Sequence, residues 1–308
     1  MKYKIFVTGS NGFIGSNLIK YLKKKNFEIY GCDNKNLKEN SKFIKSDFFS
    51  KKTINFIKNN NIDFIIHLAA TTEIKNNQKN SIKCINNNFI KTKNFLKELK
   101  NKKIKIKKFI FASSAAVYGL SSKKKLIETS TKNPISAYGK SKLMAERFIN
   151  KNAFFNIGSI FLLRFFNVTG GNMMLNKKKT FFNNLYNSYV KKNFFYIYGN
   201  DHCTKDGTPV RDFIDIKKIS LIIEKIIIKP SQNKVHTFNI GSGIGISLLE
   251  VIKYLLKKKI KIKYSYKKKK IGDISYSISN NQKIIKYLKK IKLNFNFYSQ
   301  IKKDFKIK

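Results

Sequence analysis

A β-rich segment that runs straight into three spaced glycines constrains the fold of this chain more than any other feature. Residues 3–7 (YKIFV) favour a strand, and the stretch Thr8–Gly15 (TGSNGFIG) follows at once. Glycines in this pattern permit a tight turn, close approach of a pyrophosphate to backbone N–H groups, and packing of a helix on the strand. The sequence therefore predicts a dinucleotide-binding turn with candidate contacts at Gly9, Asn11, Gly12, Phe13, Ile14 and Gly15.

An acidic residue ends the next β-rich segment. Residues 27–32 (FEIYGC) favour a second strand, which terminates at Asp33 and is followed by Asn34. An acid about 20 residues past such glycines accepts hydrogen bonds from the adenosine ribose hydroxyls and repels a 2′-phosphate. We therefore expect NAD rather than NADP, with Asp33 and Asn34 as contacts. The alternative is that Asp33 only caps its loop.

Further strands end in residues suited to the same ligand. Residues 42–45 lead to Asp47 and Phe48, which we place beside the adenine, and residues 63–70 form a buried strand. Small side chains at the end of a parallel strand let a dinucleotide lie close, so Leu68, Ala69 and Ala70 are candidate contacts. We interpret His67 as a packed residue rather than a catalyst. The helical spacing near residues 80–100 encloses Asn87, another candidate.

A hydroxyl, a phenol and a cation then follow one another in the chain. The strand at residues 107–112 delivers Ser113 and Ser114, and Tyr138 and Lys142 are spaced to share one face of a helix. A tyrosine of reference pKa about 10 becomes a useful base when a neighbouring cation lowers its pKa. The alternative is an ordinary exposed helix turn in a lysine-rich protein. The alternation of strands and helices predicts a doubly wound parallel α/β sheet.

The charge of the chain has two interpretations. The formal net charge is +48 over 308 residues, which would suit nucleic acid or an anionic surface. Lysines are, however, spread along the whole chain in short runs, as expected if lysine fills tolerant surface positions. We favour the second interpretation and expect no specific nucleic-acid partner.

Cysteine usage and hydropathy indicate the compartment. The three cysteines, Cys32, Cys84 and Cys203, form neither a C-x-x-C pair nor a metal-ligand spacing. No apolar run approaches the roughly 20 residues that span a bilayer, and the strand at residues 3–7 leaves no room for a signal peptide. We expect a cytoplasmic protein with no metal site and no membrane partner.

Four blocks resemble the extended short-chain dehydrogenase/reductase family (NAD-dependent epimerases and dehydratases), most closely its UDP-glucose 4-epimerase branch. They are Thr8–Gly15, Phe111–Gly119, Pro134–Glu146 and Tyr198–Ile214. The last block is the most specific, because other branches usually lack this acidic, glycine-containing loop before an Arg-Asp pair.

The resemblance implies NAD as cofactor and a UDP-hexose as substrate, epimerised by transient oxidation at C4. Tyr138 would take the O4 proton, Ser114 would hydrogen-bond O4, and Lys142 would hold the nicotinamide ribose and lower the pKa of Tyr138. It further implies cofactor contacts at Ser113 and Phe166 and substrate contacts at Asn167, Arg211, Lys270 and Asp273. It also implies a homodimer formed by the helices near 80–100 and 136–150.

Some residues depart from the family pattern. Ala115 and Ala116 stand where the dehydratase branch has an Asp-Glu pair, which disfavours elimination. Lys270 replaces an arginine, keeping the charge but losing the bidentate fork. Ser277 falls where the family usually has a bulky side chain that limits the space beside the sugar. Serine would leave room there for an N-acetyl group at C2.

Alternatives therefore stay open. Another NDP-sugar epimerase or reductase, including a UDP-N-acetylglucosamine 4-epimerase, is one, and a non-catalytic basic binding protein is another. Arg211 is alternatively a structural ion-pair partner of Asp212.

The predicted organisation has an NAD-binding Rossmann domain at residues 1–168, to which about 209–230 returns. Residues 169–308 mostly form a smaller, interleaved α+β substrate domain. Within these parts the pattern predicts a helix at 215–229, a strand at 235–240 and a helix at 247–258 capped by Ser247. The lysine-rich C-terminus reads as a solvated edge.

Overall fold

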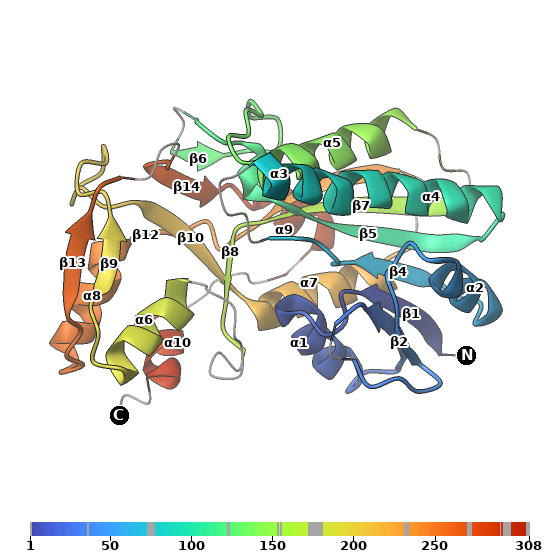
Figure 1. The fold of residues 1–308 in the computed structure, drawn as a ribbon, viewed down its shortest axis with the longest axis horizontal. Helices are drawn as coiled ribbons and strands as arrows, with labels where there is room; N and C mark the ends of the chain where they lie inside the picture. Colours follow the sequence, from blue (N-terminus) through green and yellow to red (C-terminus); the bar gives the residue numbers. More distant parts are fainter. Residues whose placement is uncertain are drawn as a thin grey trace. The chain divides into compact units, whose positions relative to one another are not determined.

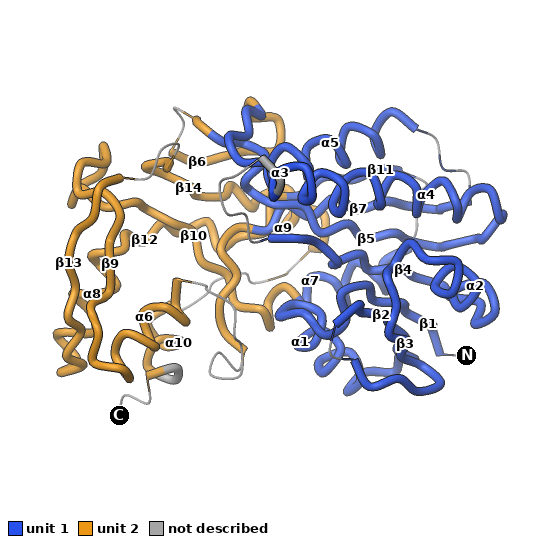
Figure 2. The backbone as a smooth tube through the Cα atoms, viewed as in Figure 1, with its two compact units in different colours: residues 1–119, 132–165, 220–238 blue, residues 120–131, 166–219, 239–308 orange. Residues whose placement is uncertain are grey.

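The computed structural model describes residues 2–35, 37–72, 78–121, 124–152, 154, 156–171, 181–230, 234–269, 273–289, 291 and 297–305. The chain divides into two compact units, shown in Figure 2. Unit 1 comprises residues 1–119, 132–165 and 220–238, and unit 2 comprises residues 120–131, 166–219 and 239–308. The chain thus leaves and re-enters each unit, and residues 120–131 belong to unit 2 although they lie early in the sequence.

Unit 1 is built on a seven-stranded sheet with the order β11-β7-β5-β4-β1-β2-β3. Its strands are β1 (Tyr3–Thr8), β2 (Phe27–Asp33), β3 (Phe43–Lys45), β4 (Phe64–His67), β5 (Ile106–Ser114), β7 (Ile157–Phe165) and β11 (Val235–Ile240). The pairings from β3 through β1 and β4 to β7 are all parallel. The predicted doubly wound sheet is confirmed, and its strand order reverses between β1 and β4.

Helices of unit 1 cover the sheet because their apolar residues recur on one face. The helices are α1 (Phe13–Leu22), α2 (Lys51–Asn59), α3 (Gln78–Ile85), α4 (Lys91–Asn101) and α5 (Ala137–Lys151), with most of α7 (Ile216–Ile228). Residues such as Ile54 of α2, Phe95 of α4 and Ile149 of α5 share one hydrophobic core with alternate residues of the strands. Figure 1 shows α1 and α7 together, away from α4 and α5.

The helical segment near residues 80–100 is interrupted. A turn of π-helix, η1 (Asn86–Ile90), separates α3 from α4. Within it Asn88 is buried; its Oδ1 accepts from the Thr71 N–H at 2.7 Å, and its Nδ2 donates to the Thr71 carbonyl at 3.0 Å. Single π turns of this kind occur frequently at functional sites. The predicted continuous helical spacing does not show this irregularity, since Asn88 takes its partners from a loop distant in sequence.

Unit 2 contains a larger and a smaller sheet. The larger has the path β12-β10-β14-β6, with β8 also paired to β10, and the smaller pairs β13 with β9. The strands are β6 (Lys125–Leu126), β8 (Asn167–Thr169), β9 (Phe195–Tyr198), β10 (Val210–Asp215), β12 (Gly245–Ser247), β13 (Tyr264–Lys267) and β14 (Tyr276–Ser279). Its helices are α6 (Phe181–Val190), α8 (Leu248–Lys257), α9 (Gln282–Leu288) and α10 (Phe297–Asp304). Aromatic residues, among them Phe182, Phe213 and Phe297, fill its core.

The later elements agree with the sequence predictions. The predicted helix at 215–229 is α7, and the predicted strand at 235–240 is β11. Ser247 caps α8 in a capping box with Glu250, as the pattern indicated. The extreme C-terminus, residues 306–308, lies outside the described residues.

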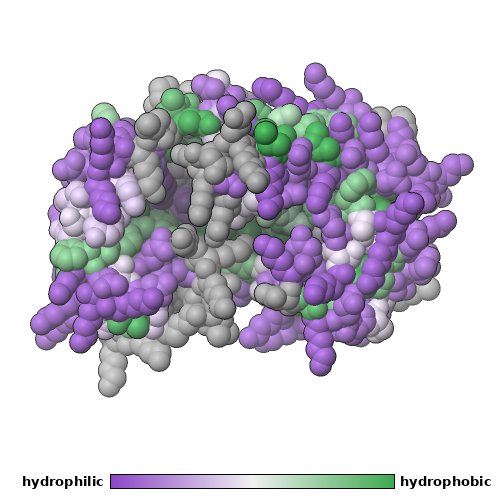
Figure 3. All heavy atoms as spheres, viewed as in Figure 1, coloured by the Kyte–Doolittle hydropathy of each residue, from purple (hydrophilic) through white to green (hydrophobic). Residues whose placement is uncertain are grey.

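Polar side chains dominate the face drawn in Figure 3, where they cover both units rather than gathering over one. Within the described ranges, no helix combines the length and apolar character that crossing a bilayer requires. The same part of the chain holds no cluster of His, Cys, Asp and Glu that could bind a metal. Cys32 and Cys84 are buried free thiols, and Cys203 is an exposed one.

Candidate functional site

The glycine turn lies where the strand order of unit 1 reverses. Gly9 has φ +67°, and a Cβ there would lie 2.9 Å from the Ala69 nitrogen at the end of β4. A Cβ on Gly15 would lie 2.2 Å from the Gly9 carbonyl oxygen, so α1 packs tightly under the turn. Gly12 begins α1 with no side-chain cap. The backbone amides at the start of α1 thus form a cradle suited to the pyrophosphate of a dinucleotide.

Asp33 ends β2 beside this turn. Its carboxylate accepts from the Asn11 N–H at 3.0 Å and the Lys35 N–H at 3.1 Å. The loop-capping role considered as an alternative is therefore present. A carboxylate has about four acceptor positions, so these two bonds leave capacity for ribose hydroxyls. Asn34 follows on the surface.

The other predicted cofactor contacts fall into two kinds. Asp47 follows β3 and pairs with Lys91 at 2.6 Å. Phe48 is buried, with its ring against His67 and Phe95. The half-buried residues Leu68, Ala69 and Ala70 follow β4, and Asn87 donates to the Thr71 hydroxyl at 3.1 Å.

Ser114, Tyr138 and Lys142 come together in unit 1. Ser114 ends β5, where its hydroxyl accepts from the Ala116 N–H at 3.2 Å, and it lies near enough to Tyr138, in the first turn of α5, to act on the pKa of that phenol. Lys142 lies one helical turn further, with its Nζ 5.9 Å from the centre of the Tyr138 ring. A hydroxyl, a phenol and an ammonium group therefore share one place at the carboxyl end of β5.

A close contact between backbone segments makes this arrangement possible. A Cβ on Gly139 would lie 2.4 Å from the carbonyl oxygen of Ala116, in the short 3-10 helix η2 (Ala115–Val117) that follows Ser114. Any larger residue would push α5 away from η2. Glycine at 139 thus keeps Tyr138 within hydrogen-bonding reach of Ser114.

The pKa of Tyr138 differs from the sequence prediction. We expected Lys142 to lower it, whereas desolvation raises it to about 12, against the opposing effect of the nearby Ser114 hydroxyl. Burial also lowers the pKa of Lys142 to about 8, and its Nζ donates to the Ala112 carbonyl at 2.6 Å. Each shift has the direction that desolvation imposes on its group.

His67 is a packed residue, in agreement with its interpretation from the sequence. It is fully buried, and its ring nitrogens contact the hydroxyls of Thr8 at 2.8 Å and Thr92 at 3.0 Å. Burial lowers its pKa to about 3, so the imidazole is neutral.

Further polar residues contact the elements that carry Ser114, Tyr138 and Lys142, and among them the sequence analysis gave a role only to Ser113. Ser113 donates from Oγ to Glu146 at 2.5 Å, and Glu146 pairs with Arg164. Asn88 donates to the Ser141 hydroxyl at 3.1 Å. The four-residue spacing of Tyr138, Lys142 and Glu146 was the available signal, since it places all three on one helix face.

In unit 2, Arg211 on β10 pairs with Asp273 at 2.6 Å, so the ion pair with Asp212 that was considered as an alternative is not the one that forms. Asp212 instead accepts from Ser242 and Ser279 in the protein interior. Burial lowers the pKa of Arg211, although Asp273 opposes this. Asn167 donates from Nδ2 to the Asp212 carbonyl at 3.1 Å.

The remaining predicted residues have simpler placements. Phe166 is buried, and its N–H donates to the Ile240 carbonyl. Ser277 is buried on β14 and is the register partner of Arg211. Lys270 lies outside the described residues.

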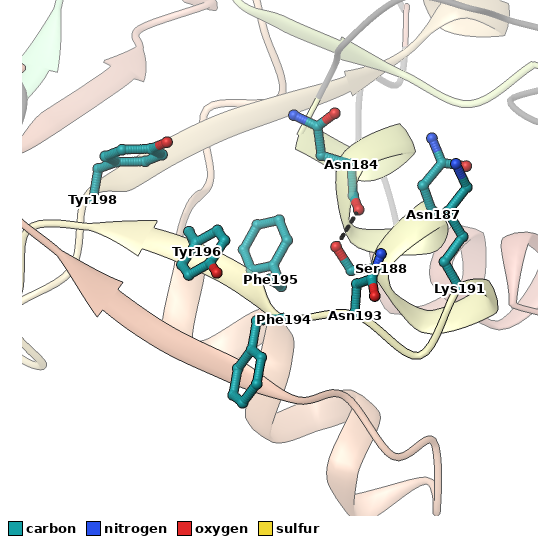
Figure 4. Close-up of a pocket in the computed structure, with 9 residues that line it drawn as sticks. All are labelled: Asn184, Asn187, Ser188, Lys191, Asn193, Phe194, Phe195, Tyr196 and Tyr198. Carbon is teal, nitrogen blue, oxygen red and sulfur yellow. Dashed lines mark hydrogen bonds between the residues drawn. The ribbon is translucent and has the colours of Figure 1, made fainter.

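A cavity of about 500 Å³ lies between α6 and β9 in unit 2. Figure 4 shows one wall formed by polar side chains of α6, including Asn184, Asn187 and Ser188. The rings of Tyr196 and Tyr198 contribute from β9. Amide groups beside aromatic rings suit a planar ligand with hydrogen-bonding edges.

Comparison with known proteins places these features in context. The family model described as "NAD dependent epimerase/dehydratase family" matches residues 5–241. UDP-glucose 4-epimerase of Mycoplasma genitalium is 34% identical over 276 residues, which cover 82% of this chain and 80% of that protein.

Two solved structures are similar along almost their whole length. One is UDP-glucose 4-epimerase of Stenotrophomonas maltophila with bound NAD and formylated UDP-arabinopyranose. It has a TM-score of 0.87 at 21% identity, and the match covers 99% of this chain and 97% of that protein's chain. The UDP-Glc/GlcNAc 4-epimerase of Campylobacter jejuni has a TM-score of 0.78 at 28% identity, and the match covers 99% of this chain and 98% of that protein's chain.

Proposed function

Because the chain belongs to the NAD-dependent epimerase/dehydratase family, whose cofactor is NAD, we propose that it is a UDP-glucose 4-epimerase that interconverts UDP-galactose and UDP-glucose. The observation that carries the proposal is the grouping of Ser114, Tyr138 and Lys142 at the carboxyl end of β5, with the Lys142 Nζ 5.9 Å from the centre of the Tyr138 ring. Ala115 and Ala116 follow in η2, where an eliminating enzyme of this family would need an acid and a base. The similarity to 4-epimerases over most of the chain supports the same activity.

The residues of unit 1 have distinct tasks in this reaction. The glycine turn and Asp33 would hold NAD, which supplies a hydride acceptor and donor at the sugar C4 when bound. Ser114 would hydrogen-bond the sugar O4, and Tyr138 would accept its proton. With a pKa of about 12, Tyr138 must first give up its own proton. Lys142, whose pKa is about 8, is largely cationic at neutral pH and favours that loss.

Unit 2 would bind the nucleotide part of the substrate. Arg211 is the proposed diphosphate contact, and its guanidinium is held by Asp273 and by the carbonyls of Val210 and Ile274. These contacts fix the side chain before a ligand arrives, which lowers the entropy cost of binding. Asn167, Lys270 and Asp273 are further proposed contacts, and the cavity between α6 and β9 would accept a planar base.

A related activity has specific support. Ser277 has a small side chain where a bulky gate is usual in the family, which favours acceptance of an N-acetyl group at C2. We therefore propose UDP-N-acetylglucosamine as an additional or alternative substrate. We also propose a cytoplasmic homodimer formed by the faces of α3, α4 and α5, on which Ile82 and Met144 are exposed.

The test is conversion of UDP-galactose to UDP-glucose by the purified protein, with UDP-N-acetylgalactosamine assayed in parallel. Tyr138→Phe is expected to lower turnover about 10²- to 10⁴-fold, the range of a lost acid–base group, and to leave NAD bound. Tyr30→Phe is the matched control, because Tyr30 is a buried tyrosine that bonds Glu28 rather than the reacting groups. Absence of turnover with both sugars and added NAD would refute the UDP-hexose assignment.

A further inference from the structure

A buried ion pair lies behind the reacting groups of unit 1. Arg164 on β7 is 3% exposed, and Glu146 on α5 is 2% exposed. The guanidinium donates twice to the carboxylate, from Nε to Oε1 at 2.9 Å and from Nη2 to Oε2 at 2.6 Å. Its Nη1 donates to the hydroxyl of Tyr118 at 2.9 Å. This bidentate geometry fixes the two side chains relative to each other.

The pair is joined to both parts of the reacting centre. Ser113 donates to Glu146 Oε1 at 2.5 Å, and the next residue along β5 is Ser114. Tyr118 closes η2, since its N–H donates to the Ala115 carbonyl at 3.1 Å. Glu146 itself lies one turn beyond Lys142 on α5. We call Ser113, Tyr118, Glu146 and Arg164 the clamp.

Stability alone does not account for two buried charges at this place. Removing an ion pair from water costs about as much as the pair returns, and well-packed apolar residues of similar volume stabilise a core equally well or better. What an apolar pair lacks is the directional link from Arg164 through Glu146 to the ends of β5 and η2. The clamp is therefore better explained by the geometry that it holds.

We propose that Glu146, fixed by Arg164, is a positioning residue of the reaction that sets the spacing of Ser114, Tyr138 and Lys142. This inference rests on the proposed function. Without the clamp, the end of β5 and the helix α5 keep their hydrophobic contacts. They lose the polar contacts that fix the position of α5 relative to the end of β5. Small misplacements of reacting groups have large effects on rate.

The clamp also contributes charge beside Lys142. The titratable groups around Lys142 are Tyr138 and Glu146 on its own helix, Cys84 on α3 and His67 on β4. Glu146 raises the pKa of Lys142 and so opposes the effect of burial. Arg164 and Lys132 are further cations close to Glu146. Loss of Glu146 should therefore lower the pKa of Lys142.

The experiment compares Glu146→Gln with Arg164→Met. In both, kcat for UDP-galactose is expected to fall about tenfold to hundredfold, with KM changed less than about threefold, because the clamp touches no substrate. Lys142 is titrated by NMR with [ε-13C]lysine, and its resonance is identified by its loss in Lys142→Arg. The midpoint should fall in Glu146→Gln, whereas mere loosening of the fold would hydrate Lys142 and raise it.

Controls separate this inference from its alternatives. Glu224→Gln removes another partly buried carboxylate of unit 1, paired with Lys25, and should leave kcat and the Lys142 midpoint unchanged. If either single variant fails to fold, the double variant Glu146→Gln/Arg164→Met removes both charges, and its kcat should still fall. Wild-type kcat in the folded variants, or a Lys142 midpoint that does not fall in Glu146→Gln, would overturn the clamp. A wild-type protein without UDP-hexose turnover would refute the proposed function instead, and the NMR midpoints would then decide the clamp alone.

Discussion

Burial favours the uncharged form of three residues in and around the candidate site of unit 1. It raises the pKa of Tyr138 to about 12 and lowers the pKa of Lys142 to about 8 and that of His67 to about 3. Each shift has the direction that loss of hydration imposes on its group. The centre is thus an environment in which any added charge acts strongly, because little water screens it.

His67 makes stability depend on pH. Its ordinary pKa is 6.5, whereas in the folded protein it is about 3, so between these values the unfolded chain binds the extra proton. Stability that is present above pH 6.5 is therefore lost as the pH falls, at about 1.4 kcal/mol per pH unit. Urea unfolding of wild type and His67→Gln at pH 6.5 and pH 4.5 measures this. The difference between the two proteins should shrink or reverse at the lower pH, and a difference independent of pH would contradict the prediction.

At this scale the sequence identifies partners that are close along the chain and misses those that are distant. The glycine turn follows from local spacing, and the Tyr138–Lys142 pair follows from its spacing together with the neighbouring motifs. The partnership of Arg211 with Asp273 does not, because these residues are brought together only by the pairing of β10 and β14. The raised pKa of Tyr138 was missed for the same reason, since burial is a property of the folded chain.

A buried lysine holds the end of α7 at the scale of elements. Lys108 on β5 is 3% exposed, and its Nζ donates to the carbonyls of Ile226 at 2.8 Å and Ile227 at 2.7 Å, and also to that of Lys229. These are among the last carbonyls of the helix, which have no partner within it. The side chain of Lys108 thus caps the C-terminus of α7 from a neighbouring strand.

Lys108→Met should destabilise the protein by about 1–3 kcal/mol, because it leaves buried carbonyls without donors. Chemical unfolding measures the change, and hydrogen exchange should show faster exchange in the last turn of α7. Lys107→Met is the matched control: its side chain is 57% exposed and pairs with Asp63, so we expect a change within about 0.5 kcal/mol. Equal stabilities of the two variants would refute the capping role.

Elements with strong local signals were predicted, and those without were not. The strands of the large sheet are runs of β-branched and aromatic residues, and α8 carries its own capping box. The strands β6 and β12 have two and three residues, which is too few to show the alternation of apolar and polar side chains that marks a strand. Their pairing partners also lie far along the chain. The π turn of η1 likewise depends on a contact between Asn88 and Thr71.

The charge of +48 acts on the molecule as a whole. A net charge so far from zero destabilises the compact state through self-repulsion, and salt reduces that repulsion by shortening the Debye length from about 30 Å at 0.01 M to about 8 Å at 0.15 M. Thermal unfolding should therefore shift to higher temperature over this range of sodium chloride. An uncharged osmolyte at equal osmolarity is the control, and a melting temperature unaffected or lowered by salt would contradict the prediction.

The interleaving of the two units governs how the chain can be made. Unit 1 needs β11 at its edge, and β11 begins only at residue 235, after almost half of unit 2 has been synthesised. Vectorial folding, in which an N-terminal domain finishes before the next is synthesised, is thus closed to this protein. No single cut yields either unit as a continuous fragment, so a product truncated before residue 235 carries two unfinished cores.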